Sequence, residues 1–122
     1  MDLSEYDNFD NNELLSDFVK ESLRLYGPAS LSFPREATKD FKLGKYRIKK
    51  GTRFLIPLTA FHHSDDFHTN SMAFDWDRFS SEKKSLQRSK PASYMPFGLG
   101  KRACIGKYLG ELMIKVMLVN FT

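Results

Sequence analysis

The feature that most constrains this chain is the string FGLGKRACIG at residues 97–106, which leads directly into an amphipathic run. The string contains the only cysteine, Cys104, among three glycines. Gly98 and Gly100 allow the backbone conformations that a tight loop requires. A cysteine at the start of a helix faces unpaired N–H groups and the positive end of the helix dipole, and both favour a thiolate. The sulfur of Cys104 is therefore a candidate anionic ligand or nucleophile.

The spacing around the cysteine is more informative than the cysteine itself. A lone cysteine is most often a small buried apolar residue without a ligand. Residues 97–106, however, follow the pattern FxxGxRxCxG and resemble the haem-binding signature of the cytochrome P450 family. The resemblance implies that the Cys104 thiolate is the axial ligand of a haem iron. It implies further cofactor contacts from Phe97, Gly98, Arg102 and Gly106.

A second motif lies near the other end of the chain. Residues 11–26 are predicted to form a helix, because apolar residues recur at spacings of three and four, and Gly27 and Pro28 end the pattern. Glu21 and Arg24 lie three residues apart, so their charged groups can share one side of the helix. Alone, such a pair is usually exposed and contributes about 0–1 kcal/mol. The spacing also resembles the ExxR helix of the same family, which implies a buried pair that helps to fix the cysteine loop.

The middle of the chain is predicted to contain a small β-hairpin. Tyr46 and Ile48 alternate with basic residues as in a half-buried strand, a turn is expected at residues 49–51, and residues 52–56 are rich in strand-forming residues. The resemblance places Arg35, in the sequence FPRE, beside a haem propionate.

Residues 74–79, FDWDRF, resemble the F-x-P-x-R-F segment of the family, although Trp76 stands where proline is common. The resemblance implies that Arg78 completes a buried structural network with Glu21 and Arg24. Such a network contributes little net stability but is costly to break, because the remaining charge stays desolvated.

Three histidines, His62, His63 and His68, lie close together in the sequence. They lack the accompanying ligand spacing of a known metal site, so surface or capping roles are the better expectation. Alignment with the family places His62 near a propionate.

The expected fold is mixed α/β and mainly α. It corresponds to residues 1–122 as a partial domain, the C-terminal haem-binding part of the cytochrome P450 fold. Its expected parts are the ExxR helix, the small β-hairpin region, a polar meander, the cysteine loop and the following helix. The apolar stripe at residues 109–117 of that last helix is interpreted as core packing.

The net charge of +4 is unevenly distributed. Residues 1–17 are acidic, whereas basic residues crowd around the cysteine loop: Lys83, Lys84, Arg88, Lys90, Lys101, Arg102 and Lys107. No nucleic-acid motif accompanies this charge, which leaves an acidic protein partner or a solvated basic face. One cysteine excludes an internal disulfide. No apolar run approaches the roughly 18 residues of a membrane span, so no membrane anchor is expected in this chain.

The resemblance implies a haem-thiolate monooxygenase. Such an enzyme uses haem b, iron protoporphyrin IX, to insert one oxygen atom of O₂ into a lipophilic organic substrate. It takes electrons from a reductase of the flavoprotein or ferredoxin type. No catalytic acid or base is assigned within this chain. Full-length relatives are often bound to the endoplasmic reticulum membrane, and the location of this protein is left open.

Two alternatives remain at this point. No segment resembles the oxygen-activating helix of the family, so the chain is expected to be inactive alone and could be a truncated or pseudogene product. It could also be a small basic interaction module without haem.

Overall fold

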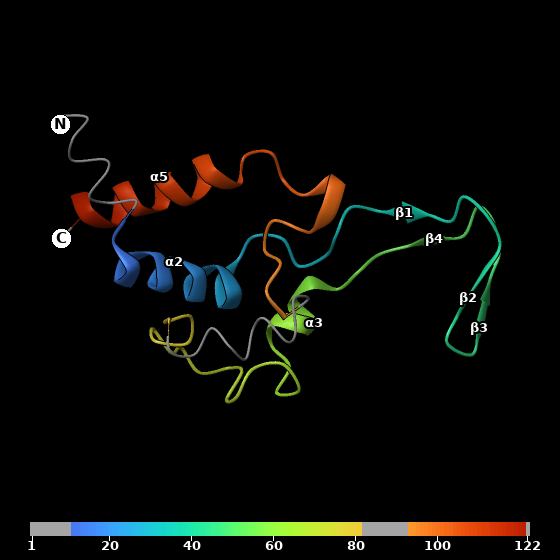
Figure 1. Cartoon of the computed structure of the whole chain (residues 1–122), viewed down its shortest axis with the longest axis horizontal. Helices are drawn as coiled ribbons and strands as arrows, with labels where there is room; N and C mark the ends of the chain where they lie inside the picture. The colour runs from blue at the N-terminus through green and yellow to red at the C-terminus, as the bar shows by residue number, and fades with distance from the viewer. Residues whose placement is uncertain (1–10, 82–92, 122) are drawn as a thin grey trace.

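The computed structural model describes residues 11–81 and 93–121. The elements, in chain order, are the helix α2 (Glu13–Tyr26), the strands β1 (Arg35–Glu36), β2 (Phe41–Leu43), β3 (Tyr46–Ile48) and β4 (Arg53–Phe54), the helix α3 (Leu58–His62), the 3₁₀ turn η2 (Gly100–Arg102) and the helix α5 (Lys107–Asn120). The arrangement is mixed α/β and mainly α, as expected. Figure 1 shows α2 packed beside α5 and α3 near the C-terminal end of α2. The strands extend away from the helices as a narrow arm.

Helix α2 begins and ends for identifiable reasons. The side chain of Asn12 accepts a hydrogen bond from the N–H of Leu15 at 3.0 Å, which caps the first turn. At the other end, a Cβ on Gly27 would collide with the carbonyl oxygen of Leu23, so only glycine fits there. The helix therefore starts two residues later than predicted and stops at Tyr26 as predicted.

The buried face of α2 differs from the predicted apolar stripe. Val19, Leu23 and Leu25 are buried, but Leu14 and Tyr26 remain 61% and 75% exposed. The polar residues Asp17, Glu21 and Arg24 are buried instead. The helix is therefore positioned by its charged side as much as by its apolar side.

The strands correct the predicted hairpin. Strand β3 pairs antiparallel with β2, and β4 pairs with β1, so residues 46–48 do not pair with residues 52–56. The connection between β2 and β3 is two residues long and contains Gly44 at φ 56°, a conformation that favours glycine in tight hairpin turns. The turn at residues 49–51 does form, since the N–H of Thr52 donates to the carbonyl of Lys49 at 3.1 Å. The strand that follows this turn, β4, therefore pairs with β1 and not with β3.

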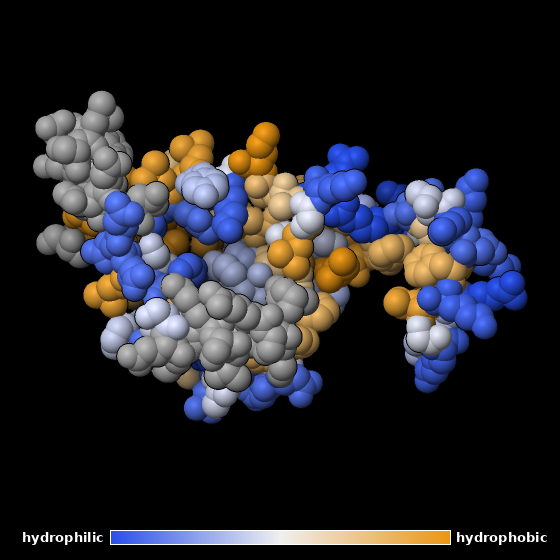
Figure 2. Space-filling model, in the orientation of Figure 1, coloured by the Kyte–Doolittle hydropathy of each residue, from blue (hydrophilic) through white to orange (hydrophobic). Residues whose placement is uncertain are grey.

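The described core is small and lies around α2. Its apolar members are Val19, Leu23, Leu25, Leu58, Phe79 and Met95, whereas Ala37 is buried separately in the strand arm, where its N–H donates to the carbonyl of Thr52. The stripe on α5 was expected to be core, but Leu109, Met113 and Met117 are 63%, 52% and 56% exposed. Figure 2 shows apolar surface along α5 and the loop before it. Among the residues described, no helix combines the length and apolar character that a membrane crossing requires.

Candidate functional site

A buried ion network joins α2 to the loop that follows α3. The Glu21 carboxylate accepts from Nε and Nη2 of Arg24, both at 2.8 Å, and from Nε of Arg78 at 3.0 and 3.1 Å. The N–H of Asp75 donates to the same carboxylate at 3.0 Å. The side chains of Glu21 and Arg24 have no exposed surface, and that of Arg78 is 9% exposed. The structure therefore brings together all three residues that the sequence placed in this network.

The remaining guanidinium donors bind backbone carbonyls. Arg24 Nη1 donates to the carbonyls of His62 and Ser71, both at 2.6 Å. Arg78 Nη1 donates to the carbonyl of Thr69 at 2.7 Å, and its Nη2 donates to that of Ala73 at 3.0 Å. These partners supply the hydrogen bonds that a buried charge requires.

The charges of the network are mutually stabilised. Burial by itself raises the pKa of Glu21, but the hydrogen bonds from Arg24, Asp75 and Arg78 outweigh that effect and leave the pKa lowered. The carboxylate is thus ionised near neutral pH. The network fixes the path of residues 62–78 against α2, because each guanidinium is bonded to several points of that loop.

Two of the three histidines are buried, which corrects the expectation of surface or capping roles. His62 and His68 are 2% and 4% exposed. The Nε2 atom of His62 accepts from the N–H of Met95 at 2.9 Å, and that of His68 lies 2.8 Å from the carbonyl oxygen of Ser93. His63 is half-buried, with its Nε2 atom 3.2 Å from the carbonyl oxygen of Leu25. With Nε2 bound to Met95, the expected contact of His62 with a haem propionate would have to come from Nδ1 of a ring that is almost fully buried.

No local sequence pattern indicates the buried roles of His62 and His68. The partners of His62 and His68 lie 33 and 25 residues further along the chain. Within the described ranges, no group of three or more histidine, cysteine, aspartate or glutamate residues is arranged to hold a metal ion.

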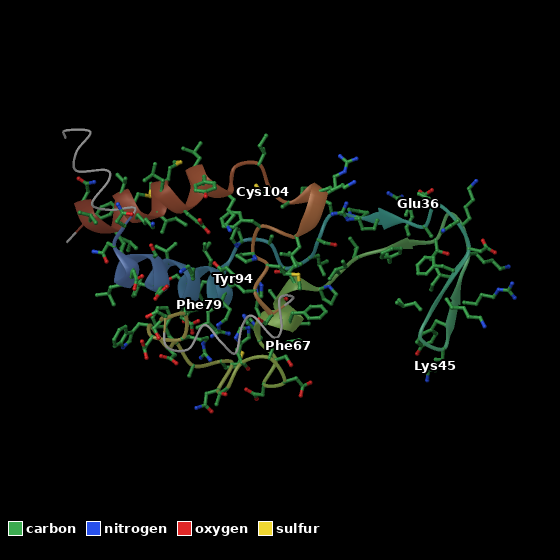
Figure 3. The ribbon with its side chains drawn as sticks, in the orientation of Figure 1. Glu36, Lys45, Phe67, Phe79, Tyr94 and Cys104 are labelled. Atoms are coloured by element: carbon green, nitrogen blue, oxygen red, sulfur yellow. The ribbon has the colours of Figure 1, made fainter. Side chains whose placement is uncertain are left out.

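Residues 93–95, here called the entry segment, lead into the cysteine loop. Ser93 and Met95 are buried. The Tyr94 ring packs edge-on against Phe79 with ring centroids 4.8 Å apart, and Figure 3 shows the two rings together near α2. Burial, followed by the charges of Glu111 and Glu21, raises the pKa of Tyr94.

The cysteine loop is shaped by short backbone hydrogen bonds. The N–H of Gly98 donates to the carbonyl of Met95 at 2.9 Å, and the N–H of Cys104 donates to that of Phe97 at 2.8 Å. Gly98 and Gly100 both have φ 71°, where other residues are strained. The loop thus folds back on itself before α5 begins at Lys107.

The loop presents the sulfur outward. Cys104 is exposed, and Figure 3 places it between η2 and α5. The neighbouring apolar side chains of Leu99 and Ile105 are also exposed. A Cβ at Gly106 would lie 3.8 Å from the sulfur, so glycine leaves that flank of the sulfur open. The Phe97 ring packs on α5, since a Cβ at Gly110 would lie 3.6 Å from it.

The resemblance implies a haem at this cysteine, and an accessible sulfur beside apolar side chains is compatible with that expectation. Cations for anionic groups are also present. Arg102 is exposed on η2 and Arg35 is half-buried on β1, and neither forms an ion pair within the described part of the chain. Lys101 and Lys107 are exposed as well. The other basic residues expected near the loop, Lys83, Lys84, Arg88 and Lys90, lie outside the described residues.

Comparisons with known proteins agree with this geometry. The family model "Cytochrome P450" matches residues 2–121. Cytochrome P450 82A1 of Pisum sativum is 41% identical over 104 residues, covering 84% of this chain and 19% of that protein. Thromboxane-A synthase of Mus musculus is 41% identical over 102 residues, covering 84% of this chain and 19% of that protein. The cytochrome P450DA heme domain superimposes with a TM-score of 0.83 at 32% identity, covering 93% of this chain and 25% of that structure. The chain thus spans about a fifth of the length of the relatives it matches.

Proposed function

This chain belongs to the cytochrome P450 family, and on that premise we propose that it forms the cysteine-bearing, haem-binding portion of a haem-thiolate monooxygenase. The family is one of haem- and iron-binding oxidoreductases. The observation that best supports the assignment is the exposed Cys104 on a glycine-shaped loop at the start of α5.

We assign the haem contacts as follows. Cys104 would be the axial ligand, while Phe97, Gly98 and Gly106 would leave room for the ring and shape the loop. Arg102 and Arg35 would bind the propionates, because both guanidinium groups lack an ion-pair partner among the described residues. When bound, haem b would supply the iron at which O₂ is activated. The role of this chain is then to hold the sulfur in place and to orient the ring.

Glu21, Arg24 and Arg78 have a structural role in this proposal. Their network is buried, so it does not contact substrate. It fixes the loop after α3 against α2, and that loop in turn packs against the entry segment through Phe79 and His68.

The whole protein would contain more than this chain. Electrons would come from a reductase of the flavoprotein or ferredoxin type, and the substrate would be a lipophilic organic molecule. The described residues supply only the cysteine side of the site, whereas haem enzymes enclose both faces of the ring in a mostly apolar pocket. We therefore propose that these residues are part of a longer enzyme and do not turn over substrate alone.

The proposal is tested by a chimera in which residues 2–121 replace the matching quarter of a solved cytochrome P450 haem domain. The reduced carbon-monoxide complex should show a thiolate-type Soret band, because Cys104 is the only cysteine in the inserted segment. The Cys104→Ser variant should lose that band. The control is Ala103→Ser, which adds a hydroxyl to the neighbouring exposed position and should keep the band.

A folded chimera that binds no haem would contradict the proposal and favour an interaction module. A thiolate-type band that survives in Cys104→Ser would remove the ligand role from Cys104.

A further inference from the structure

Two buried histidines attach the entry segment to the rest of the molecule. His62 accepts from the N–H of Met95 at 2.9 Å, whereas Nε2 of His68 lies 2.8 Å from the carbonyl oxygen of Ser93. These partners assign opposite tautomers, since a backbone N–H requires a lone pair on His62 Nε2 and a carbonyl requires a proton on His68 Nε2. Both ends of the three-residue segment are thereby fixed.

The middle residue of the segment is held by aromatic contacts. Tyr94 lies between the two histidine bonds and packs against Phe79 at 4.8 Å and against the His62 ring at 6.0 Å, measured between centroids. Phe79 is itself 2% exposed and follows Arg78 directly in the sequence. The segment is therefore enclosed by residues whose positions depend on the ion network.

His62 joins the ion network to the entry segment. Its backbone carbonyl accepts from Arg24 Nη1 at 2.6 Å, while its ring accepts from Met95. A displacement of His62 would thus disturb both the buried guanidinium and the segment before the cysteine loop. Burial, followed by the charges of His68, His63 and Arg24, lowers the pKa of His62 to about 4, so its ring is neutral and can accept near pH 7.

The entry segment is joined in turn to the cysteine. The carbonyl of Met95 accepts from the N–H of Gly98, where the chain turns at positive φ. The carbonyl of Phe97, the residue before that turn, accepts from the N–H of Cys104. Hydrogen bonds therefore continue from His62 through Met95 into the turn that places the sulfur.

From these contacts we propose that His62 and His68 are positioning residues that set the conformation of the loop bearing Cys104. The inference about the loop stands on the hydrogen bonds themselves. Its meaning for haem ligation rests on the proposed function.

The test is amide hydrogen exchange at single-residue resolution, measured by mass spectrometry on the full chain at a concentration where it is monomeric. His62→Leu and His68→Leu remove one hydrogen bond each at similar volume. Exchange at the N–H groups of Gly98 and Cys104 should accelerate about tenfold. Exchange at Val19 and Leu23 in α2 should change by less than about twofold, because the histidine bonds do not involve them.

Matched variants separate positioning from general stability. His62→Gln and His68→Gln retain an acceptor and a donor at similar reach and should restore slow exchange at Gly98 and Cys104. His63→Leu is the control, since His63 contacts Leu25 and not the entry segment. His63→Leu should leave the exchange rates at Gly98 and Cys104 unchanged. His62→Asn, whose shorter amide cannot reach Met95, serves if the leucine variant does not fold, and it should accelerate the same two amides.

The positioning role would be overturned if the leucine variants accelerated amide exchange only at Met95 or nowhere. It would also be overturned if they accelerated exchange uniformly, α2 included, or if His63→Leu accelerated exchange at Gly98 and Cys104 as much as they do. The same variants in the haem-domain chimera distinguish this inference from the proposed function. Loop exchange that responds as expected in a chimera without haem would refute the proposed function alone. A thiolate-type spectrum with unchanged loop exchange would refute the positioning role alone.

Discussion

At the scale of single residues, two sets of buried polar side chains determine the structure around the cysteine loop: the network of Glu21, Arg24 and Arg78, and the histidines His62 and His68. Glu21 and Arg24 are three residues apart on one helix, so their contact follows from helix geometry. Arg78 lies 57 residues from Glu21 and was placed beside it only through resemblance to a known family. His62 and His68 bond to backbone groups far along the chain, and backbone groups leave no mark in a sequence. Their burial was therefore not predictable.

The buried His62 predicts a specific pH dependence. Its pKa is about 4 in the folded chain against an ordinary value of 6.5, so below pH 6.5 the unfolded state binds a proton that the folded state does not. The free energy of unfolding should therefore fall as pH decreases from 6.5 towards 4, by on the order of 3 kcal/mol from this residue. Urea unfolding between pH 6.5 and 5 measures the slope, because nearer pH 4.5 the protonation of Glu21 in the unfolded state adds to it.

His62→Gln should reduce this pH dependence, because glutamine does not titrate, and should leave the part that comes from His68, whose pKa burial also lowers. His63→Gln serves as the control and should keep the slope of the parent chain. An unchanged slope in His62→Gln would show that His62 is not buried in the neutral form.

At the scale of elements, the helices were predicted more closely than the strands. The α2 pattern lies within one stretch of sequence and ends at a glycine that tolerates no Cβ. The strands are two or three residues long, too short for alternation to decide which pairs with which. Gly44 is the residue that points to the observed pairing, because its positive φ allows the two-residue connection of β2 to β3. The apolar stripe of α5 predicted a helix correctly but not its burial, since periodicity does not say what covers a face.

The attachment of α2 to the loop after α3 predicts a large effect of Arg24→Ala. The change leaves the Glu21 carboxylate buried with one guanidinium and removes the bonds to the carbonyls of His62 and Ser71. Losing one partner of a buried charged group typically costs about 3–5 kcal/mol. In the chimera, Arg24→Ala should therefore lower haem content and folded yield, measured by absorbance and thermal unfolding.

Lys20→Ala is the matched control. Lys20 also pairs with a carboxylate three residues away on α2, that of Asp17 at 2.7 Å, but its side chain is 31% exposed. Lys20→Ala should lower the free energy of unfolding by less than about 1 kcal/mol. Equal effects of the two substitutions would show that the Glu21–Arg24 pair is an ordinary surface ion pair.

At the scale of the whole molecule, apolar side chains on α5 and α2 are left uncovered within the described part of the chain. The exposed side chains on α5 and α2 include Leu109, Met113, Met117, Leu14 and Tyr26. Extensive exposed apolar surface marks an interaction face or favours aggregation. The family fold was recognised from short motifs, but this exposure depends on what surrounds the chain, which its own residues do not specify.

The isolated chain is accordingly expected to self-associate and to lack monooxygenase activity. Self-association is measured by light scattering across a concentration series. Activity is measured after reconstitution with haem, a reductase, NADPH and a panel of lipophilic substrates. Substrate-dependent product that disappears in Cys104→Ala would contradict this expectation and show that these residues form a sufficient active site.

X-ray absorption at the iron edge of the haem-loaded chimera decides whether the Cys104 sulfur ligates the haem iron. The first coordination shell of the ferric iron should contain one sulfur atom. This sulfur should be absent in Cys104→Ser and present in Ala103→Ser. An iron shell containing only nitrogen and oxygen in the parent chimera, or a sulfur that persists in Cys104→Ser, would rule out Cys104 as the ligand.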